Sequence, residues 1–525
     1  MASMATRYAP TGAVAAANHL AAEAGAAMLD RGGTAADAAV AAAATMAVTS
    51  PHMCGLGGDL FAIVVTPSGP PAALNASGRA GSGADAASLR SAGLTRMPFQ
   101  HDIQSVTIPG CVDGLTALHA RFGRLALADV LAPAIRFARD GFPVSLTLAD
   151  ASHVLEPEIR AAAFGASDAL VAGRRLTVPG VGQALADVAA GGRGAFYEGG
   201  PGRALRALGE GLFSAQDLSA VQADWVQPLS LDAFGRRLWT IPPNSQGYLA
   251  LAGAWIAEQV GVPVDPADDA WAFVLVEAAR QAAHDRVAVL HEGADGAALI
   301  SPERLAPRAQ AIRGGAGRGL ADVYSDGDTT YLCAVDGDRT GVSLIMSNAA
   351  GFGAHLVLDA HGILLHNRGM GFSLTDGHPA ELGPGRRPPH TLSPLAVTRE
   401  DGGLEAVIGS MGGDAQPQIV LQLLARTLIA GEDSGTAVDA PRWSLTREDS
   451  MGFDTWEYEE PPIVALEHGA PNTWSEGLRR RGYRVHEAKP GEGGFGHAQV
   501  IQVGADDMLG GAADSRPRDG ACIGL

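Results

Sequence analysis

The chain has 525 residues, 46% hydrophobic and 18% charged, with 57 acidic against 38 basic residues and a net charge of −19. This composition excludes a disordered chain, and the negative charge would repel a phosphate backbone or an anionic membrane surface. We therefore expect a compact protein with no nucleic-acid or membrane partner. The sequence shows neither a signal-peptide pattern nor an apolar run long enough to cross a bilayer, so we expect a cytoplasmic location.

The elements predicted in the first part of the chain are helices followed by strands. Residues 14–47 favour helix and are interrupted by Arg-Gly-Gly at 31–33, which predicts two helices, each buried on one face. Residues 61–66 and 72–76 form short β-prone runs around a Pro/Gly turn. Residues 271–291 have apolar positions spaced by three and four, which predicts the longest helix, lying on a sheet.

The most informative change of pattern comes before Thr329. Residues 314–328 are glycine-rich and polar without apolar periodicity, which predicts an exposed, flexible loop. Residues 329–335 (TTYLCAV) and 341–346 (GVSLIM) are β-prone, and the DGDRT turn between them indicates a hairpin. A Thr-Thr pair alone is ordinary in a strand, since threonine is favoured there. Here, however, it marks the point where a mobile loop enters a sheet.

The cysteines and possible metal ligands give no sign of a crosslinked or metal-dependent fold. The four cysteines, Cys54, Cys111, Cys333 and Cys522, lie far apart and form no C-x-x-C pair. This spacing is typical of reduced, packed thiols. No H-E-x-x-H or comparable ligand spacing occurs, so we expect no metal and no other cofactor.

Nine motifs stand in an order that resembles the gamma-glutamyltranspeptidase family nearly from end to end. They are LAAEAGAAMLDRGGTAADAAVAAA (20–43), PHMCGLGGDLFAIV (51–64), SVTIPGCVDG (105–114), IPPNSQGYLAL (241–251), EAARQAAHDR (277–286), DTTYLCAVD (328–336), HTLSPLAV (390–397), GSMGGDAQPQ (409–418) and GGAADSRPRDG (510–520). The resemblance implies the α+β, four-layer αββα sandwich of N-terminal-nucleophile hydrolases. In that fold two stacked antiparallel sheets lie between helical layers, and Thr329 would begin a central strand.

Self-cleavage between Asp328 and Thr329 is the second implication of the resemblance. It would give a large subunit, residues 1–328, and a small subunit, residues 329–525, which stay together as a heterodimer and form one structural domain. Cleavage would also give Thr329 a free α-amine. A hydroxyl needs an adjacent base, and an α-amine with a pKa of about 7.7 to 8.0 supplies one on the same residue.

The resemblance assigns the other catalytic positions by motif. The backbone amides of Gly412 and Gly413 would bind the oxyanion, ahead of a predicted helix at 418–430 whose dipole favours negative charge. A plain glycine-rich turn is the alternative interpretation. Ser347 matches a family threonine that hydrogen-bonds the nucleophile and aids processing. Ser410 lacks the first glycine of G-x-S-x-G, so we expect a structural role for it.

The resemblance also assigns residues that bind the substrate's carboxylate. Arg79, in LNASGRAG, matches the family arginine that pairs with it, a task suited to a bidentate guanidinium, although a surface arginine is the simpler interpretation. His390 and Thr391 stand where the family has paired serines that hydrogen-bond the same carboxylate. A protonated His390 would add positive charge there.

Two departures from the family pattern bear on the substrate. Arg368 and Gly371 stand where transpeptidases place a Gln and an Asp that hold the γ-glutamyl amino group. Without that carboxylate, an α-ammonium would be desolvated with no partner, which costs several kcal/mol. The link from Phe372 to His390 is also short for a lid loop, so water should enter and hydrolysis should exceed transfer.

These features resemble the lidless branch of the family, which includes oxamate amidohydrolases and glutaryl-cephalosporin acylases. We therefore expect an amidohydrolase for small acyl amides that carry a carboxylate, oxamate-like or glutaryl-like. The alternatives are a glutathione hydrolase or γ-glutamyltransferase, and an unprocessed family member that only binds ligands.

Overall fold

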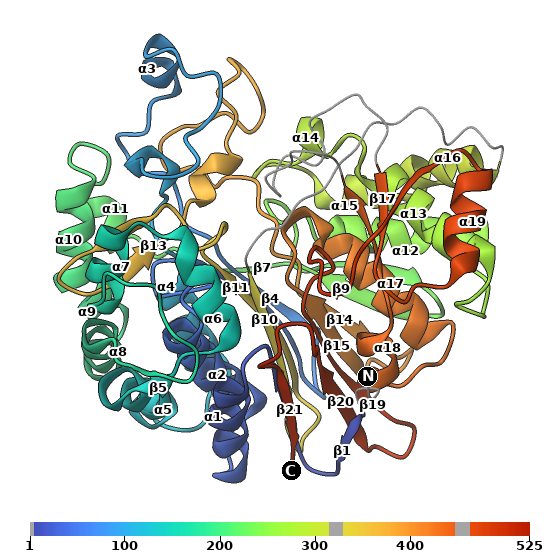
Figure 1. The fold of residues 1–525 in the computed structure, drawn as a ribbon, viewed down its shortest axis with the longest axis horizontal. Coiled ribbons are helices and arrows are strands. Elements are labelled where there is room, and N and C mark those ends of the chain that lie inside the picture. Colours follow the sequence, from blue (N-terminus) through green and yellow to red (C-terminus); the bar gives the residue numbers. More distant parts are fainter. Residues whose placement is uncertain (1–4, 314–328, 447–462) are drawn as a thin grey trace.

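The protein is built around two seven-stranded sheets that lie face to face, with helices on the outer side of each (Figure 1). The structure, a computed structural model, describes residues 5–313, 329–446 and 463–525. All strand pairs in the two sheets are antiparallel. The predicted α+β sandwich of four layers is thus confirmed. The segment 314–328, expected to be a flexible loop, lies outside the described residues, and so does Asp328.

The strands of the two large sheets come from distant parts of the chain. In spatial order the first sheet contains β1 (Arg7–Ala9), β20 (Leu509–Ala513), β19 (Ala498–Val503), β15 (Leu404–Ser410), β14 (Leu395–Thr398), β9 (Arg236–Thr240) and β8 (Leu229–Ala233). The second contains β21 (Ala521–Gly524), β2 (Ala13–Ala16), β10 (Thr330–Val335), β11 (Gly341–Ser347), β3 (Asp59–Val65), β4 (Ala72–Ala76) and β7 (Asp224–Val226).

The helices form two groups, one on each side of the sandwich (Figure 1). On the side of the second sheet lie α1 (His19–Asp30), α2 (Ala35–Thr49), α3 (Ala86–Ser91), α4 (Cys111–Phe122), α5 (Leu127–Asp140), α6 (Leu146–Ala151), α7 (Pro157–Phe164), α8 (Pro179–Gly191), α9 (Arg193–Tyr197), α10 (Gly200–Leu208) and α11 (Ala215–Ser219). On the side of the first sheet lie α12 (Tyr248–Val260), α13 (Asp269–Ala283), α14 (Arg286–Val289), α15 (Gly296–Leu299), α16 (Pro302–Arg313), α17 (Gln416–Leu428), α18 (Ser434–Asp439) and α19 (Asn472–Arg480).

Smaller elements complete the described chain. They are the strand pairs β5 (Phe142–Pro143) with β6 (Arg175–Leu176) and β12 (Leu356–Leu358) with β13 (Ile363–Leu365), the sheet of β16 (Trp443–Thr446), β17 (Ile463–Leu466) and β18 (Arg484–Glu487), and the short 3-10 helices η1 (Ile103–Ser105), η2 (Ser152–Val154), η4 (Arg368–Gly371) and η5 (Gly413–Ala415). None of the described helices has the length and apolar character needed to span a membrane.

Three apolar layers hold the sandwich together. One lies between the second sheet and its helices, one between the first sheet and its helices, and one between the two sheets. Side chains alternate along β10, so Tyr331 and Cys333 enter the layer between the sheets, whereas Leu332 and Ala334 face the helices. Since both faces of β10 are buried, the strand is apolar throughout.

Several predicted elements are confirmed, and three differ. The strand at 72–76 and the hairpin of β10 and β11 occur as predicted. Residues 14–16, predicted as helix, belong to β2. The second predicted helix is buried over all of α2 and not on one face, because α2 lies between the strands β10 and β11 and the helices α1, α4 and α5. The predicted helix at 271–291 ends at Ala283, and α13 packs mainly on other helices.

All four cysteines are described, and none forms a disulfide, as expected.

Candidate active site

Thr329 lies immediately before β10 in the second sheet and is fully buried. Its Oγ1 is 2.9 Å from the Oγ of Ser347, at the end of the neighbouring strand β11. The Ser347 Oγ also accepts a hydrogen bond of 2.7 Å from the N–H of Ala349. The structure therefore brings together the two residues predicted as nucleophile and hydroxyl partner.

The two glycines predicted to bind an oxyanion follow β15, which faces β10 across the sandwich. A Cβ on Gly409 would lie 2.3 Å from the ring of Tyr331, so glycine lets β15 pack directly against β10. Gly412 and Gly413 have φ values of 136° and 51°, which favour glycine. No described residue accepts a hydrogen bond from either N–H. Two backbone donors thus stand ahead of α17, where the helix dipole also favours negative charge.

Gln246 connects two predicted parts of the site. One is the oxyanion segment, Gly412 and Gly413, and the other is the carboxylate-binding segment, His390 and Thr391. Its side-chain amide donates to the carbonyl oxygens of Gly413 (3.0 Å) and Thr391 (3.2 Å). Its backbone N–H donates to the carbonyl of His390 (2.9 Å). Because Gln246 is fully buried, these bonds fix the two segments relative to one another.

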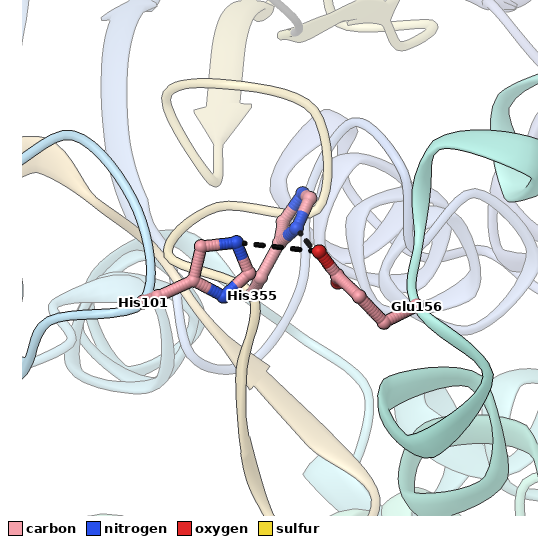
Figure 2. Close-up of side chains that lie close together, drawn as sticks. All are labelled: His101, Glu156 and His355. Atoms are coloured by element: carbon pink, nitrogen blue, oxygen red, sulfur yellow. Dashed lines mark ion pairs between the residues drawn. The ribbon is translucent and has the colours of Figure 1, made fainter.

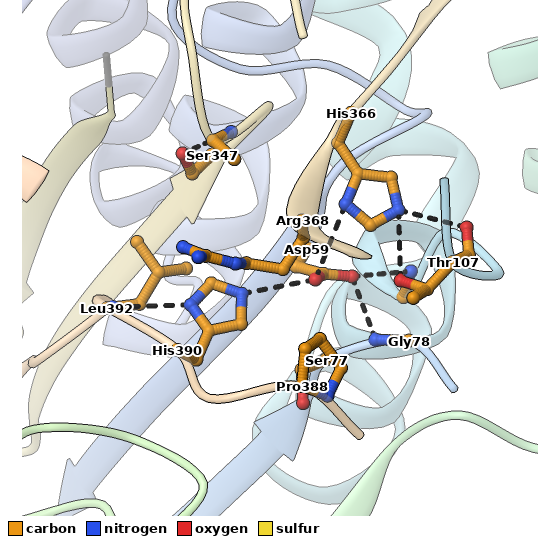
Figure 3. A network of polar contacts seen from close by, with 12 residues as sticks. Asp59, Ser77, Gly78, Thr107, Ser347, His366, Arg368, Pro388, His390 and Leu392 are labelled. Carbon is orange, nitrogen blue, oxygen red and sulfur yellow. Dashed lines mark hydrogen bonds and ion pairs between the residues drawn. The ribbon is translucent and has the colours of Figure 1, made fainter. Parts of the chain in front are cut away.

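Asp59 is a buried carboxylate at the centre of a polar network that includes His366 and His390 (Figure 3). Asp59 begins β3 and pairs with Ser347 in the sheet. Its Oδ1 accepts hydrogen bonds from the N–H groups of Gly78 (2.9 Å) and Gly110 (3.1 Å). Its Oδ2 lies 3.1 Å from the Nε2 of His390. Burial acts to raise the pKa of Asp59, but His366, His390 and the Gly78 N–H outweigh it and lower that pKa.

His390 cannot supply the positive charge that its position suggested. Burial, and then the neighbouring charge of Arg368, lower the pKa of His390 to about 4, against the opposing effect of Asp59. The imidazole is therefore neutral near pH 7. The added charge that a protonated His390 would have supplied is therefore absent near neutral pH, and Arg368 is the cation beside Thr391.

Buried neutral histidines make the fold sensitive to acid. Burial lowers the pKa of His390 to about 4 and, together with His497, that of His52 to about 3. An unfolded histidine has a pKa of about 6.5, so below that pH the unfolded chain binds protons that the folded chain excludes. We expect the free energy of unfolding to fall by about 1.4 kcal/mol per pH unit for each histidine as pH decreases from about 6.5 toward 4. Urea denaturation between about pH 7 and 5 measures this, and a constant stability would contradict it.

Arg368 is the buried cation of the site. It is only 2% exposed and donates to the Oγ1 of Thr391 (3.3 Å). Burial, and then the charge of Arg286, lower the pKa of Arg368 to about 10, so it stays protonated at neutral pH. Arg286 pairs in turn with Asp414 (3.3 Å), the residue after Gly413. Two arginines are thus held beside the oxyanion segment.

Arg368 and Arg286 line a cavity of about 450 Å³. The walls also include Phe99, Met370 and Phe372. The short link between Phe372 and His390 contributes a further part of the wall, with Leu374, Ala380 and Pro389. The cavity therefore combines an apolar lining with arginine groups.

Gly371 makes room for the Arg368 side chain. A Cβ at this position would lie 2.7 Å from the carbonyl oxygen of Pro389 and 2.9 Å from the Nη2 of Arg368. The two replacements of the first departure, Arg368 and Gly371, are therefore linked, because the arginine occupies space that a side chain at position 371 would fill.

Arg79 is held in a separate group of charges. Its Nη1 lies 2.6 Å from Glu292 and its Nη2 lies 3.2 Å from Asp224, and both of these partners are carboxylates. Its backbone adjoins Gly78, which donates to Asp59. Within the described chain its side chain contacts neither Arg368 nor Thr391, so its predicted contact with a substrate carboxylate stays a prediction.

Four residues of this arrangement had no role in the sequence prediction: Asp59, Gln246, Arg286 and His366. Three of them lie within the motifs that carry the family resemblance, Asp59 in PHMCGLGGDLFAIV, Gln246 in IPPNSQGYLAL and Arg286 at the end of EAARQAAHDR. His366 begins the segment that contains Arg368. The available signal was the place of Asp59, Gln246 and Arg286 within these motifs.

Two stacked antiparallel sheets, with a buried threonine at the start of a central strand and two glycine amides opposite, define an N-terminal-nucleophile hydrolase. The family model described as Gamma-glutamyltranspeptidase matches residues 21–524. The chain belongs to the gamma-glutamyltranspeptidase family, and it is a hydrolase proenzyme of that family.

Relatives and solved structures agree with this assignment. The chain is 34% identical to the oxamate amidohydrolase proenzyme of Klebsiella pneumoniae subsp. pneumoniae, over 98% of each chain. It is also 34% identical to the glutathione hydrolase-like YwrD proenzyme of Bacillus subtilis, over 97% of each chain. A cephalosporin acylase from Bacillus halodurans superposes with a TM-score of 0.88 at 30% identity, over 99% of this chain and 97% of the other.

Proposed function

We propose that this protein hydrolyses amide bonds of small acyl amides whose acyl group carries a carboxylate, such as oxamate or glutaryl amides. The observation that carries the proposal is the buried, protonated Arg368, which donates to Thr391 and lines a cavity together with Arg286, the partner of Asp414. A planar guanidinium binds a carboxylate through two parallel hydrogen bonds. No metal or cofactor is needed for this chemistry.

Self-cleavage between Asp328 and Thr329 would generate the catalytic group. Each large sheet combines strands from before residue 314 with strands from after residue 328. In the second sheet β2 pairs with β10 and β21, and in the first sheet β1 pairs with β20. The two products, residues 1–328 and 329–525, would therefore stay together as one heterodimer with a shared core.

The reaction follows from the roles of the site residues. The α-amine of Thr329 takes the proton of its own hydroxyl, and Oγ1 attacks the amide carbonyl. The N–H groups of Gly412 and Gly413 stabilise the negative charge on the carbonyl oxygen. The C–N bond then breaks, the amine leaves with a proton, and water hydrolyses the Thr329 ester. Ser347 holds the hydroxyl by its 2.9 Å contact.

Arg368 and Gly371, which stand in place of the Gln and Asp of the transpeptidases, should disfavour a substrate with an α-amino group. At position 371 there is no side chain, and Arg368 fills that space. A substrate ammonium would meet a cation there, which disfavours γ-glutamyl amides relative to glutaryl amides. Thr391 can donate to the same substrate carboxylate, whereas neutral His390 is held by Asp59.

The test is a comparison of kcat/KM for oxamate, glutaryl-p-nitroanilide and γ-glutamyl-p-nitroanilide with the processed protein. We expect oxamate or the glutaryl amide to be preferred by tenfold or more, the effect of about 1.4 kcal/mol in transition-state binding. A preference for the γ-glutamyl amide would instead support a glutathione hydrolase or γ-glutamyltransferase. The similarity to a glutathione hydrolase-like proenzyme favours this as the second candidate.

Gly371→Ala tests whether the space at position 371 holds Arg368 in place. The added Cβ would meet the backbone carbonyl of Pro389, which cannot move cheaply, so Arg368 should shift. We expect kcat/KM for the preferred amide to fall by roughly tenfold, because misplaced binding groups weaken the transition state. Gly383→Ala is the matched control in the same link, since its Cβ would meet only the flexible Arg386 side chain at 3.2 Å. Equal activities of the two variants would argue against this role of Gly371.

A further inference from the structure

The side chains of His101, Glu156 and His355 come from separate segments and point toward one another (Figure 2). His101 comes from the loop before η1, Glu156 from the residue before α7, and His355 from the residue before β12. One ligand atom from each lies within 4.8 Å of the others. His101 and Glu156 are exposed, and His355 is buried.

The two distances between a histidine and the carboxylate in this cluster are longer than good hydrogen bonds and close to the spacing of metal ligands. The Nε2 of His101 lies 3.4 Å from one carboxylate oxygen of Glu156, and the Nδ1 of His355 lies 3.4 Å from the other. A good N–H···O hydrogen bond is about 2.7 to 3.2 Å long. Ligands around a tetrahedral zinc ion, with bonds of about 2.0 Å, stand roughly 3.3 Å apart.

The buried histidine gives an independent indication of a ligand. His355 is 4% exposed, and its buried Nδ1 makes no hydrogen bond with any described residue, only the 3.4 Å contact with the Glu156 carboxylate. The same atom points at Glu156 (Figure 2). The other ring nitrogen, Nε2, lies 3.1 Å from the side-chain amide of Gln100. A metal on Nδ1 leaves the ring proton on Nε2, and this proton needs an acceptor, so the Gln100 amide would turn over to present its oxygen there.

We propose that His101, Glu156 and His355 bind a zinc ion. Two imidazole nitrogens and a carboxylate oxygen form a ligand set that suits zinc, with a water in the fourth position. The exposed ligands leave the ion a path to enter. The spacing of these residues in the sequence matches no metal-binding motif, because three separate segments supply the ligands.

The ion would connect the loop that carries His101, which contributes to the cavity of Arg368, with the segments that carry Glu156 and His355. The loop that carries His101 also carries Phe99 and Met97, which line the cavity of Arg368. The carbonyl oxygen of Phe99 accepts a hydrogen bond of 2.7 Å from Asn367, next to Arg368. If the chain is cleaved as proposed, His101 and Glu156 belong to the large subunit and His355 to the small one. The ion then links the two subunits, although the binding site itself does not depend on cleavage.

Calorimetric titration of untagged, chelator-treated protein with zinc chloride tests the site. We expect about one ion per chain, a higher melting temperature with zinc, and tetrahedral Co²⁺ absorption bands when cobalt replaces zinc. His101→Asn, in which asparagine tolerates the φ of 59° at this position, and Glu156→Gln should each weaken binding at least roughly tenfold. The exposed residues His468 and Glu158 provide matched controls as His468→Asn and Glu158→Gln, and both should bind like the wild type.

Each outcome decides the question without reference to amide hydrolysis. Stoichiometric binding that is lost in the two ligand variants and kept in the two controls supports the site. Absence of stoichiometric binding by the wild type overturns the proposal, as does binding of equal strength in the ligand variants.

Discussion

Thr329→Ala is expected to remain a single chain and to lose amide hydrolysis by roughly 10⁴-fold or more, the usual consequence of removing a nucleophile. The variant lacks the hydroxyl that would attack the Asp328–Thr329 peptide bond, so no α-amine base is released either. The fold should survive, because among the residues that the structure describes the Thr329 side chain forms a hydrogen bond only with Ser347. Turnover of oxamate and glutaryl-p-nitroanilide measures the loss, with circular dichroism as the check on folding.

Thr329→Ser is the matched control for this prediction. Serine keeps both the hydroxyl and, after cleavage, the α-amine, so the variant should still be processed and retain measurable activity. An Ala variant that hydrolyses the same amides at a rate near that of the wild type would show that another residue is the nucleophile.

Arg368→Gln is expected to lower kcat/KM for glutaryl-p-nitroanilide by about ten- to hundredfold. A hydrogen bond to a charged group contributes about 1.5 to 3 kcal/mol, and this variant removes the guanidinium that would bind the acyl carboxylate. An amide with an uncharged acyl group of similar size should lose much less, because it never used that charge. The ratio of the two substrates separates lost recognition from general damage to the site.

Arg79→Gln provides the comparison, because family resemblance assigns the carboxylate to Arg79. That arginine is already paired with Glu292 and Asp224, so we expect a smaller loss of carboxylate preference than in Arg368→Gln. If Arg79→Gln alone abolishes the preference, the substrate carboxylate lies at Arg79, and the role proposed for Arg368 is wrong.

Local sequence signals predicted the hairpin that follows Thr329 well. The β-prone runs on either side of the DGDRT turn are short and apolar, and each pairs with its sequence neighbour as β10 and β11. The alternation that places Tyr331 and Cys333 on the face of Thr329 follows from strand geometry alone.

Elements that depend on distant partners were predicted less well. Residues 14–16 are one valine and two alanines, and alanine suits a helix, but they pair with β10 and β21, which lie more than three hundred residues later in the chain. The break after Ala283 puts Arg286 at the start of a new short helix, where it reaches Asp414. Apolar periodicity continues through this break, so the pattern could not reveal it.

The predicted site shows the same division. Motif positions identified Thr329 and Ser347, which do lie together. The state of His390 depends on Asp59, which comes from a strand more than three hundred residues away in sequence. The sequence identifies which residues have polar or titratable side chains. Burial and contacts between distant segments determine which of those side chains carry a charge.

We propose that self-cleavage makes Thr329 the first residue of a separate chain. Intact-mass measurement of the purified wild type tests this cleavage. We predict two fragments whose masses account for the whole chain, the smaller of which begins at Thr329. A single mass for folded, intact protein would contradict the account, because the α-amine on which the proposed chemistry depends would never form.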